Sequence, residues 1–459
     1  MARLCKEHTL RLLPPFPKID ALPENTKRDL ALDSVRAWSL IVVVFGHFIM
    51  QIYYWENGIP QSGNTLSSGT LWPFSTWLLQ VMPLFFIAGG AVNFGSYLRS
   101  QGNFNQWLWQ RTRRLMKPTV VFLLTLALMF SVITYFADET VTDDLVSGVT
   151  GPLWFLSVYI IVVSLTPVSV KMWNALSKKS LLILLALAII VDYVRLNVLD
   201  ALGVLNLIII WVMVHLLGFW YQEGVKKQHA RFMIIVGLLC NIVLTQVVRW
   251  YPTSLVGIPT EKFSNMAPPT IILAFHSFVL FGLLVLLAPW LQKVTSTPRG
   301  FRLMSRAAML AMTIYLWHMA VLVAWLAALH YLNLDLPSRI ENSVIVPDGI
   351  SYWLWLIPST IGFGLVLYFV IRLLWPIEFM TIKWFDNAKN SISHSKLRAT
   401  LGTLLTSLGL LAISGAGFSG FPFAIRESFG IPISTFGALI AIGVGLALLR
   451  QPAREVDRV

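Results

Sequence analysis

The chain has 459 residues, of which 56% are hydrophobic and only 12% are charged, whereas a soluble globular protein carries about 25% charged residues. This composition excludes an ordinary soluble enzyme, and the mean hydropathy of +0.70 excludes a disordered scaffold. The formal net charge of +13 fits either nucleic-acid binding or the basic cytoplasmic face of a membrane protein, and the placement of the charges decides between them.

Twelve runs of about 20 mostly apolar residues follow one another along the chain, and each is long enough to cross a bilayer as a helix. We therefore predict an all-α fold, a polytopic transmembrane helix bundle. The twelve centres lie near residues 44, 83, 126, 162, 188, 210, 240, 280, 317, 363, 408 and 441.

The basic residues are distributed unevenly over the connecting segments. The two tails and the even-numbered loops hold 29 of the 35 Lys and Arg residues, the odd-numbered loops hold five, and Arg36 stands at the mouth of the first helix. By the positive-inside rule, both termini and residues 376–398 are predicted to be cytoplasmic, and residues 57–69 and 138–150 to be outside. The net charge then indicates a multi-pass protein in the lipids of the cytoplasmic (inner) membrane, and no nucleic-acid partner.

The longest polar break divides the chain into a body of ten helices and a final pair. In that pair Gly437, Ala441 and Gly445 recur at four-residue spacing, which places small residues on one helix face. This face fits either packing onto the body or a contact with another copy or a partner. The predicted divisions are a cytoplasmic tail (1–32), the ten-helix membrane domain (33–375), a basic connector (376–398), the helix pair (399–449) and a second tail (450–459).

Ionisable residues inside apolar spans are costly to bury, so each carries a functional hypothesis. Asp33, Arg36 and His47 share one face of the first helix, because eleven residues at 100° per residue return to within about 20° of the starting direction. His47 is about 16 Å deeper than Arg36 and is expected near the middle of the hydrocarbon core. Its imidazole fits a hydrogen bond between helices or a neutral general base. Arg36 fits a snorkelling cation or an ion pair with Asp33.

A second basic cluster lies at the predicted cytoplasmic entrance of the third helix. Arg111, Arg113, Arg114 and Lys117 place four positive charges within seven residues. The cluster is explained either by the positive-inside signal alone or by binding of the phosphates of a cytoplasmic cofactor, which the planar guanidinium group suits. Such a cofactor would also need to lie close to Arg36.

Three further residues each have a structural and a functional interpretation. Asn93, in a glycine-rich helix, belongs to a helix crossing or is an oxyanion donor. Trp154 is an aromatic-belt anchor or a platform for a sugar ring, and His318 is a core residue or lies beside the acceptor. Because Cys5 and Cys240 are the two cysteines and no His-Glu-x-x-His pattern occurs, no metal site is predicted.

Five short motifs occur in order along the ten-helix body. They are Leu32-Asp33-Ser34-Val35-Arg36 followed by His47, the Phe-Phe-rich segment 83–90, the basic segment 111–118, Leu-Trp-Phe-Leu at 153–156 and Ile-Tyr-Leu-Trp-His at 314–318. Together they resemble acyltransferase family 3, the integral-membrane acyltransferases that decorate surface glycans and lipids. The resemblance spans about residues 29–375. The chain departs from the family pattern at Ala88, where a serine is common, and at Pro152, where a histidine often precedes the Leu-Trp pair.

The resemblance implies O-acyl transfer from cytoplasmic acyl-CoA, expected to be acetyl-CoA, to a hydroxyl group of an extracytoplasmic glycan or glycolipid. In this reaction His47 would be the catalytic residue, and the arginines would hold the phosphates of the donor. Asn93 and Asp33 would stabilise the oxyanion or support the site.

A twelve-span secondary transporter or exporter of a lipid-linked sugar is the competing prediction, since such proteins also have both termini inside. The missing internal repeat and the scarcity of intramembrane carboxylates, of which Asp192 is the clearest, disfavour it. A catalytically silent membrane partner of another enzyme is a third prediction.

Overall fold

The computed structural model describes residue 16 and residues 28–56, 59–67, 72–100, 103–136, 148–258, 261, 263–341, 344–347, 349–386, 395–418, 421–423, 425–428 and 431–450. Within these residues the chain is almost entirely helical, which confirms the predicted all-α polytopic bundle. Most of the predicted tail 1–32 and loop 138–150, the middle of the connector 376–398 and the tail after Arg450 lie outside the described residues.

The helices follow the apolar runs of the sequence. They are α1 (Leu30–Met50), α2 (Trp72–Leu79), α3 (Met82–Leu98), α4 (Phe104–Phe136), α6 (Leu153–Ser164), α7 (Thr166–Leu176), α8 (Lys179–Asn197), α9 (Val204–Glu223), α10 (Lys227–Ile242), α11 (Ile271–Thr295), α12 (Pro298–Tyr331), α13 (Gly349–Phe379), α14 (Lys383–Asp386), α15 (Lys396–Ala416) and α16 (Thr435–Arg450). Three antiparallel hairpins join β1 (Gln51–Glu56) to β2 (Ile59–Asn64), β3 (Ser338–Glu341) to β4 (Val344–Pro347), and β5 (Ile425–Ser428) to β6 (Ile431–Ser434).

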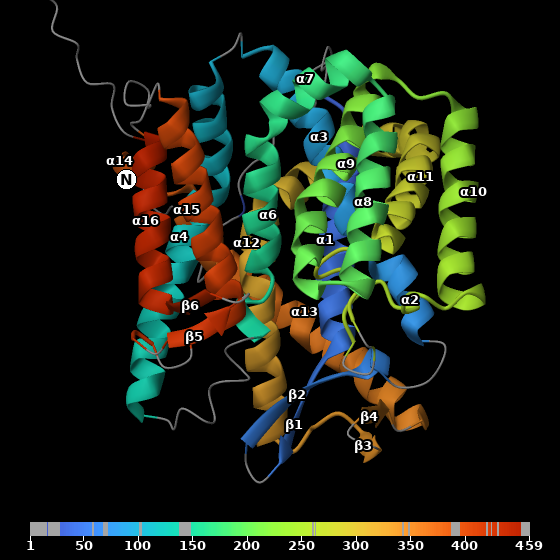
Figure 1. The fold of residues 1–459 in the computed structure, drawn as a ribbon. Helices are drawn as coiled ribbons and strands as arrows, with labels where there is room; N and C mark the ends of the chain where they lie inside the picture. The colour runs from blue at the N-terminus through green and yellow to red at the C-terminus, as the bar shows by residue number, and fades with distance from the viewer. Residues whose placement is uncertain are drawn as a thin grey trace, which may run out of the picture.

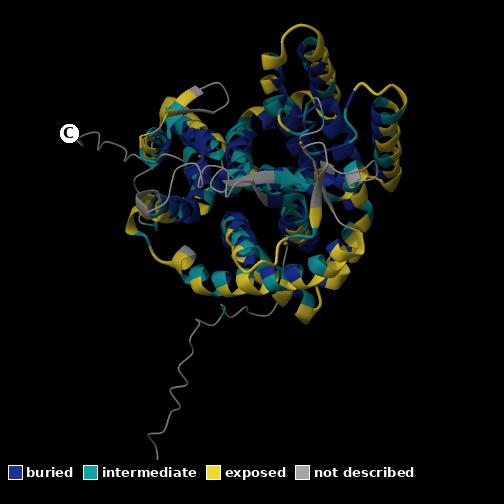
Figure 2. Ribbon diagram, turned by 90° about the horizontal axis from the view of Figure 1, so that it is seen from below, coloured by how far each residue is buried: buried dark blue, intermediate teal, exposed yellow. Residues whose placement is uncertain are grey.

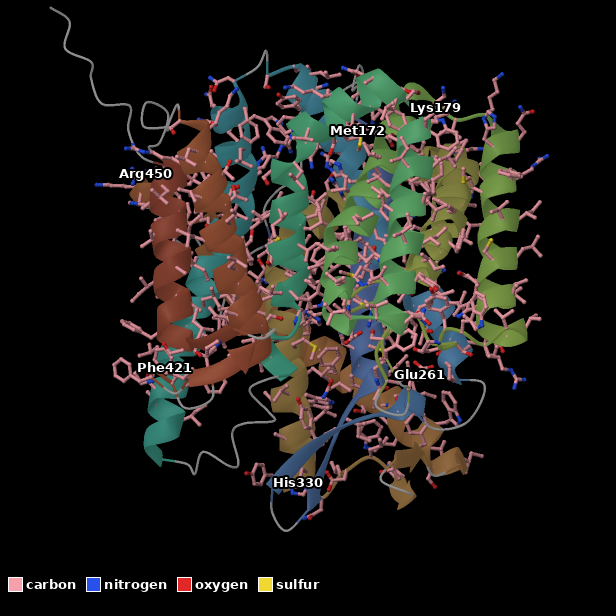
Figure 3. The ribbon with its side chains drawn as sticks, viewed as in Figure 1. Met172, Lys179, Glu261, His330, Phe421 and Arg450 are labelled. Carbon is pink, nitrogen blue, oxygen red and sulfur yellow. The ribbon has the colours of Figure 1, made fainter. Side chains whose placement is uncertain are left out.

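The long helices stand side by side, and their ends form two opposite faces of the bundle (Figure 1). Lys179 at the start of α8 and Arg450 at the end of α16 lie at one of these faces, whereas Glu261 and His330 lie at the other (Figure 3). We call the first the basic end. The second is called the hairpin end, because β1–β2 and β3–β4 project from it (Figure 1).

The described part of the chain contains ten helices that are long and apolar enough to cross a membrane. Two of the twelve predicted spans differ from this simple form. The run near residue 162 forms α6 and α7, which are bent by 55° relative to each other, and Pro167 in the first turn of α7 lacks the N–H that a continuous helix would use. The run near residue 441 forms α16, which has only 16 residues.

Glycines bring α3 and α9 into close contact. A Cβ atom on Gly90 would lie 1.9 Å from the carbonyl oxygen of His215, and one on Gly218 would lie 2.1 Å from the carbonyl oxygen of Ile87. Larger side chains at these positions would push the two helices apart. The contact therefore fixes the place of α3, which forms one wall of the site described below.

The final helix pair packs within the chain. α15 and α16 approach closely, since a Cβ atom on Gly402 or Gly445 would lie 2.7 Å from the other residue's carbonyl oxygen. α15 also contacts α6, where the Ser157 hydroxyl donates to the carbonyl oxygen of Ser407 at 2.7 Å. Of the two predicted roles for the small-residue face, packing therefore accounts for Gly445.

Burial follows the arrangement of the helices. Seen from the hairpin end, buried residues lie between the helices and exposed residues lie on the periphery (Figure 2). Many of the exposed residues are large and apolar, such as Leu128, Ile190 and Leu354. A surface of this kind is expected of helices that face lipid.

Candidate active site

A cavity of about 890 Å³ runs along α1 through the bundle. Its wall includes Asp33 and Arg36 near the start of α1, and Met50 and Gln51 at the other end of this helix. Asp33 and Gln51 are 18 positions apart, so the cavity follows about 27 Å of helix, close to the ~30 Å of a hydrocarbon core. The cavity therefore extends from the basic end toward the hairpin end.

His47 lines this cavity and contacts a second histidine behind it. Nδ1 of His47 and Nε2 of His318, on α12, are 3.1 Å apart. Nδ1 of His318 lies 2.7 Å from the carbonyl oxygen of Tyr315, and the His318 side chain is completely buried. His318 thus stands behind His47 in the core and is not among the residues that line the cavity.

The carbonyl oxygen of Tyr315 determines the protonation of both rings. A carbonyl oxygen only accepts, so Nδ1 of His318 carries the proton and donates it to this bond. Nε2 of His318 then carries a lone pair, and Nδ1–H of His47 donates to it. This arrangement leaves the lone pair of His47 on Nε2, in a ring that lines the cavity. The pair is therefore arranged for Nε2 of His47 to accept a proton.

His47 lies nearer the hairpin end than the sequence predicts. α1 begins at Leu30, so His47 is 17 residues, or about 26 Å, from the start of the helix and three residues from its end. The prediction of a position near the middle counted depth from Arg36, which lies six residues inside the helix. A molecule that binds at Arg36 must therefore extend about 16 Å to reach His47.

Arg36 and Asp33 both line the basic-end part of the cavity, but they do not form a pair with each other. Nη2 of Arg36 donates to the carbonyl oxygen of Ala88 on α3 at 3.1 Å. Asp33 instead forms an ion pair with Arg28. The Arg36 contact uses the main chain of Ala88, where the family commonly has a serine, and so it does not require a particular side chain there.

The arginine cluster at the start of α4 is divided between two environments. Arg111 and Arg114 line the cavity. Nη1 of Arg113 instead donates to the carbonyl oxygen of Phe385 at 3.4 Å and lies 3.9 Å from Oδ1 of Asp386. Arg36, Arg111 and Arg114 therefore form a basic group in the cavity, and Arg113 does not belong to it.

Asp386 joins α4 to the short helix α14. Lys117 Nζ donates to Oδ2 of Asp386 at 3.0 Å. Although burial opposes ionisation, the hydrogen bonds from Lys117 and from the Ile382 N–H, together with the charges of Lys117 and Arg113, hold the pKa of Asp386 below its usual range. Arg113 thus has a structural partner outside the cavity.

Asn93 lies in the basic-end part of the cavity and is only 2% exposed. Its Nδ2 is 3.4 Å from Nε2 of His215 on α9. Asn93 follows Ala88 by five residues on α3, which places it about 8 Å from the Arg36 contact in the direction away from His47. The structure therefore brings Asn93 to the basic group and does not bring it to His47 as an oxyanion donor.

Trp154 lies in the first turn of α6 and lines the cavity. Its ring centroid is 6.3 Å from that of Phe155, which also lines the cavity, and 6.3 Å from that of Trp211. A ring that faces an internal cavity is not a simple belt anchor. This position therefore favours the second prediction for Trp154, a platform against which a sugar ring can pack.

The loop that precedes α11, residues 248–270, contributes Val256 and Met266 to the hairpin-end part of the cavity. Within this segment the main-chain N–H of Ser254 donates to Oε1 of Glu261 at 3.2 Å. Burial outweighs this bond and raises the pKa of Glu261 to about 7, from an ordinary value of 4.5. The carboxyl group therefore binds a proton near neutral pH.

Several residues that line the cavity were not predicted from the sequence. Tyr315 lies inside the motif 314–318 but was not singled out, and Tyr159 follows Leu156 at helical spacing on the cavity side of α6. No sequence pattern predicts that the methionines line one cavity, because they come from separate helices and a loop. Among the described residues, six methionines line the cavity, namely Met50, Met82, Met266, Met309, Met312 and Met319.

Comparison with known proteins agrees with this arrangement. A family model described as an acyltransferase domain matches residues 29–371, which confirms the resemblance predicted over about residues 29–375. No protein of curated function and no solved structure matches the chain. Within the described residues, no group of three or more His, Cys, Asp or Glu side chains could hold a metal ion. Because the match covers well over half of the chain and the spans are in place, the chain belongs to acyltransferase family 3 and is a multi-pass membrane acyltransferase.

Proposed function

We propose that this acyltransferase moves an acyl group, expected to be acetyl, from cytoplasmic acyl-CoA to a hydroxyl group of a glycan or glycolipid outside the cytoplasmic membrane. One observation carries the proposal. A single cavity holds a basic group near one end, formed by Arg36, Arg111 and Arg114, and His47 near the other. The uneven distribution of Lys and Arg supports a cytoplasmic basic end.

The distance between the basic group and His47 suits CoA. Arg36 and His47 are separated by about 16 Å along α1. In CoA about thirteen bonds lie between the pyrophosphate and the thioester sulfur, and an extended chain of that length reaches about 16 Å. A donor whose phosphates contact the arginines can therefore present its thioester at His47. Guanidinium groups also bind phosphate with paired, charge-assisted hydrogen bonds.

His47 and His318 supply the chemistry of transfer. Nε2 of His47 takes the proton from the acceptor hydroxyl, and the hydroxyl oxygen attacks the thioester carbonyl carbon. The C–S bond then breaks, and the CoA sulfur leaves and receives the proton from Nε2. While His47 carries this extra proton, its Nδ1–H bond to His318 becomes a stronger, charge-assisted hydrogen bond. His318 thus acts through His47, as the third group of a catalytic triad acts through its base.

The part of the cavity beyond His47 suits an amphipathic acceptor. Trp154 offers an aromatic face of the kind on which sugar rings pack. Met50, Met266 and Met319 line the same cavity with flexible apolar side chains, which adapt to irregular shapes. We therefore place the acceptor hydroxyl on the hairpin side of His47, opposite the donor.

The test uses the purified chain in nanodiscs with acetyl-CoA labelled in the acetyl group. The acceptor is a glycan and glycolipid extract from cells that lack the chain. We expect label in the extract, one CoA thiol released for each acetyl group transferred, and no transfer by His47→Ala. Thiol release without an acetylated product, or equal labelling by His47→Ala, contradicts the proposal. Mass spectrometry of the extract then identifies the acceptor by its acetyl increment.

A further inference from the structure

α15 and α16 lie outside the matched acyltransferase domain, which ends at residue 371. They nevertheless contact the part of the body that holds the site. The Ser414 hydroxyl on α15 donates to the carbonyl oxygen of Gly151 at 2.5 Å. Gly151 lies two residues before α6, whose first turn lines the cavity. The final helix pair therefore reaches the site through one hydrogen bond to the main chain.

The start of α6 also contacts α12. The Tyr315 hydroxyl donates to the carbonyl oxygen of Pro152 at 2.5 Å, one residue beyond the acceptor of Ser414. No side chain caps the start of α6. The two hydroxyl groups donate to carbonyl oxygens that also accept from the main-chain N–H groups of Trp154 and Phe155, so both bonds hold the main chain just before the helix. The dipeptide Gly151-Pro152 is held from both sides, by α15 and by α12.

Tyr315 continues this chain of contacts to His47. Its carbonyl oxygen accepts from Nδ1 of His318, and Nε2 of His318 accepts from Nδ1 of His47. Tyr315 is thus fixed at its hydroxyl group by α6, while its main chain fixes the proton on His318. Hydrogen bonds therefore connect α15 to the imidazole of His47, through the main chain before α6, Tyr315 and His318.

We propose that the C-terminal helix pair supports the active site. Ser414 and Tyr315 are positioning residues that hold the ring of His318 in place against His47. The proposal rests on the proposed acyl transfer for its activity readout. It assigns to α15 a role that the matched domain does not include. Ser414 and Tyr315 act through His47, so their loss should slow the chemical step and leave donor binding intact.

The test compares Ser414→Ala with Ser407→Ala in the full chain. Both serines lie on α15, but the Ser407 hydroxyl has no hydrogen-bond partner among the described residues, so its removal breaks no hydrogen bond. Hydrogen bonds between membrane helices contribute about 0.6 to 1.7 kcal/mol, which corresponds to about three- to twentyfold. We expect Ser414→Ala and Tyr315→Phe each to lower kcat about threefold or more at unchanged KM for acetyl-CoA, and Ser414→Thr to restore kcat.

A double-mutant cycle then tests whether Ser414 and Tyr315 act through the same series of hydrogen bonds or affect kcat independently. Ser414→Ala should have little further effect on kcat in Tyr315→Phe, because the same chain is already broken. Additive losses in kcat, or a change confined to KM, would overturn the proposal. Equal losses in Ser414→Ala and Ser407→Ala would overturn it as well, because they would show a general effect on packing.

A second readout does not depend on acyl transfer. In the chain labelled with ¹⁵N-histidine, the ring nitrogens of His318 are assigned by their loss in His318→Gln. We expect Ser414→Ala and Tyr315→Phe to shift the His318 and His47 signals, and Ser407→Ala to leave them in place. Shifted signals without any transfer would retain this proposal and refute the proposed function. Acyl transfer by the parent chain together with unshifted histidine signals in the variants would support the proposed function and refute the role of the helix pair.

Discussion

Arg111, Arg113 and Arg114 stand within four consecutive positions, yet only Arg111 and Arg114 line the cavity. The structure therefore provides a matched control for donor binding. A charge-assisted hydrogen bond contributes about 1.5 to 3 kcal/mol, so we expect Arg111→Gln or Arg114→Gln to raise KM for acetyl-CoA about ten- to a hundredfold. Arg113 faces Asp386 at 3.9 Å in a partly exposed pair, and such pairs contribute about 0 to 1 kcal/mol to stability. Arg113→Gln should leave KM within about twofold.

The assay separates phosphate contacts from general effects by comparing two donors. Acetyl-CoA carries the nucleotide phosphates, whereas acetylpantetheine carries the same thioester without them. KM for acetylpantetheine divided by KM for acetyl-CoA should be large in the parent chain and in Arg113→Gln. The same ratio should be smaller in Arg111→Gln and Arg114→Gln. The reasoning is refuted if Arg113→Gln weakens acetyl-CoA use as much as its neighbours do. It is also refuted if the losses with acetylpantetheine are equally large.

Three further predictions concern pH, packing and topology. Because the pKa of Glu261 is raised from 4.5 to about 7, its contribution to the stability of its loop is fully present below about pH 4.5 and is lost as the pH rises through about 7. Hydrogen exchange of that loop should show this loss, and Glu261→Gln should abolish the pH dependence. A Cβ atom on Gly90 would lie 1.9 Å from a carbonyl oxygen, whereas one on Gly443 would meet nothing within 4 Å. Gly90→Ala should therefore lower the melting temperature and Gly443→Ala should not, since overpacking costs about 1 to 3 kcal/mol. Single cysteines in residues 57–69 should react with an impermeant thiol reagent in intact cells, and labelling of residues 376–398 would contradict the assigned orientation.

The sequence predicted the bundle well because apolar runs of about 20 residues have few alternatives to membrane helices. It predicted the depth of His47 less well. The helix begins at Leu30, and the Asp29 side chain accepts from the N–H of Leu32 at 3.1 Å. An aspartate at this position is a helix-start signal that counting from Arg36 overlooked.

Contacts between residues far apart in the sequence account for the other differences between the predicted site and the structure. His47 and His318 are 271 residues apart, and both belong to recognisable motifs, but no local pattern shows that their rings meet. Similarly, Lys117 and Asp386 are 269 residues apart. The sequence around Arg113 therefore does not show that Asp386 is its partner outside the cavity. Helical spacing does carry part of this information. Arg111 and Arg114 are three residues apart and share a helix face, which Arg113 does not.

The central claim is that His47 performs the chemical step, and its replacement in the purified chain tests this most directly. A positioned base contributes about 10² to 10⁴-fold to the rate. His47→Ala and His47→Gln should therefore lose detectable transfer from acetyl-CoA while they still bind the donor, and Arg36→Ala should lose donor binding instead. His330→Ala, at the far end of α12, serves as the control and should retain full activity. If His47→Ala transfers acetyl groups at a rate within about threefold of the parent, less than about 1 kcal/mol of the barrier belongs to His47, and its role is one of packing.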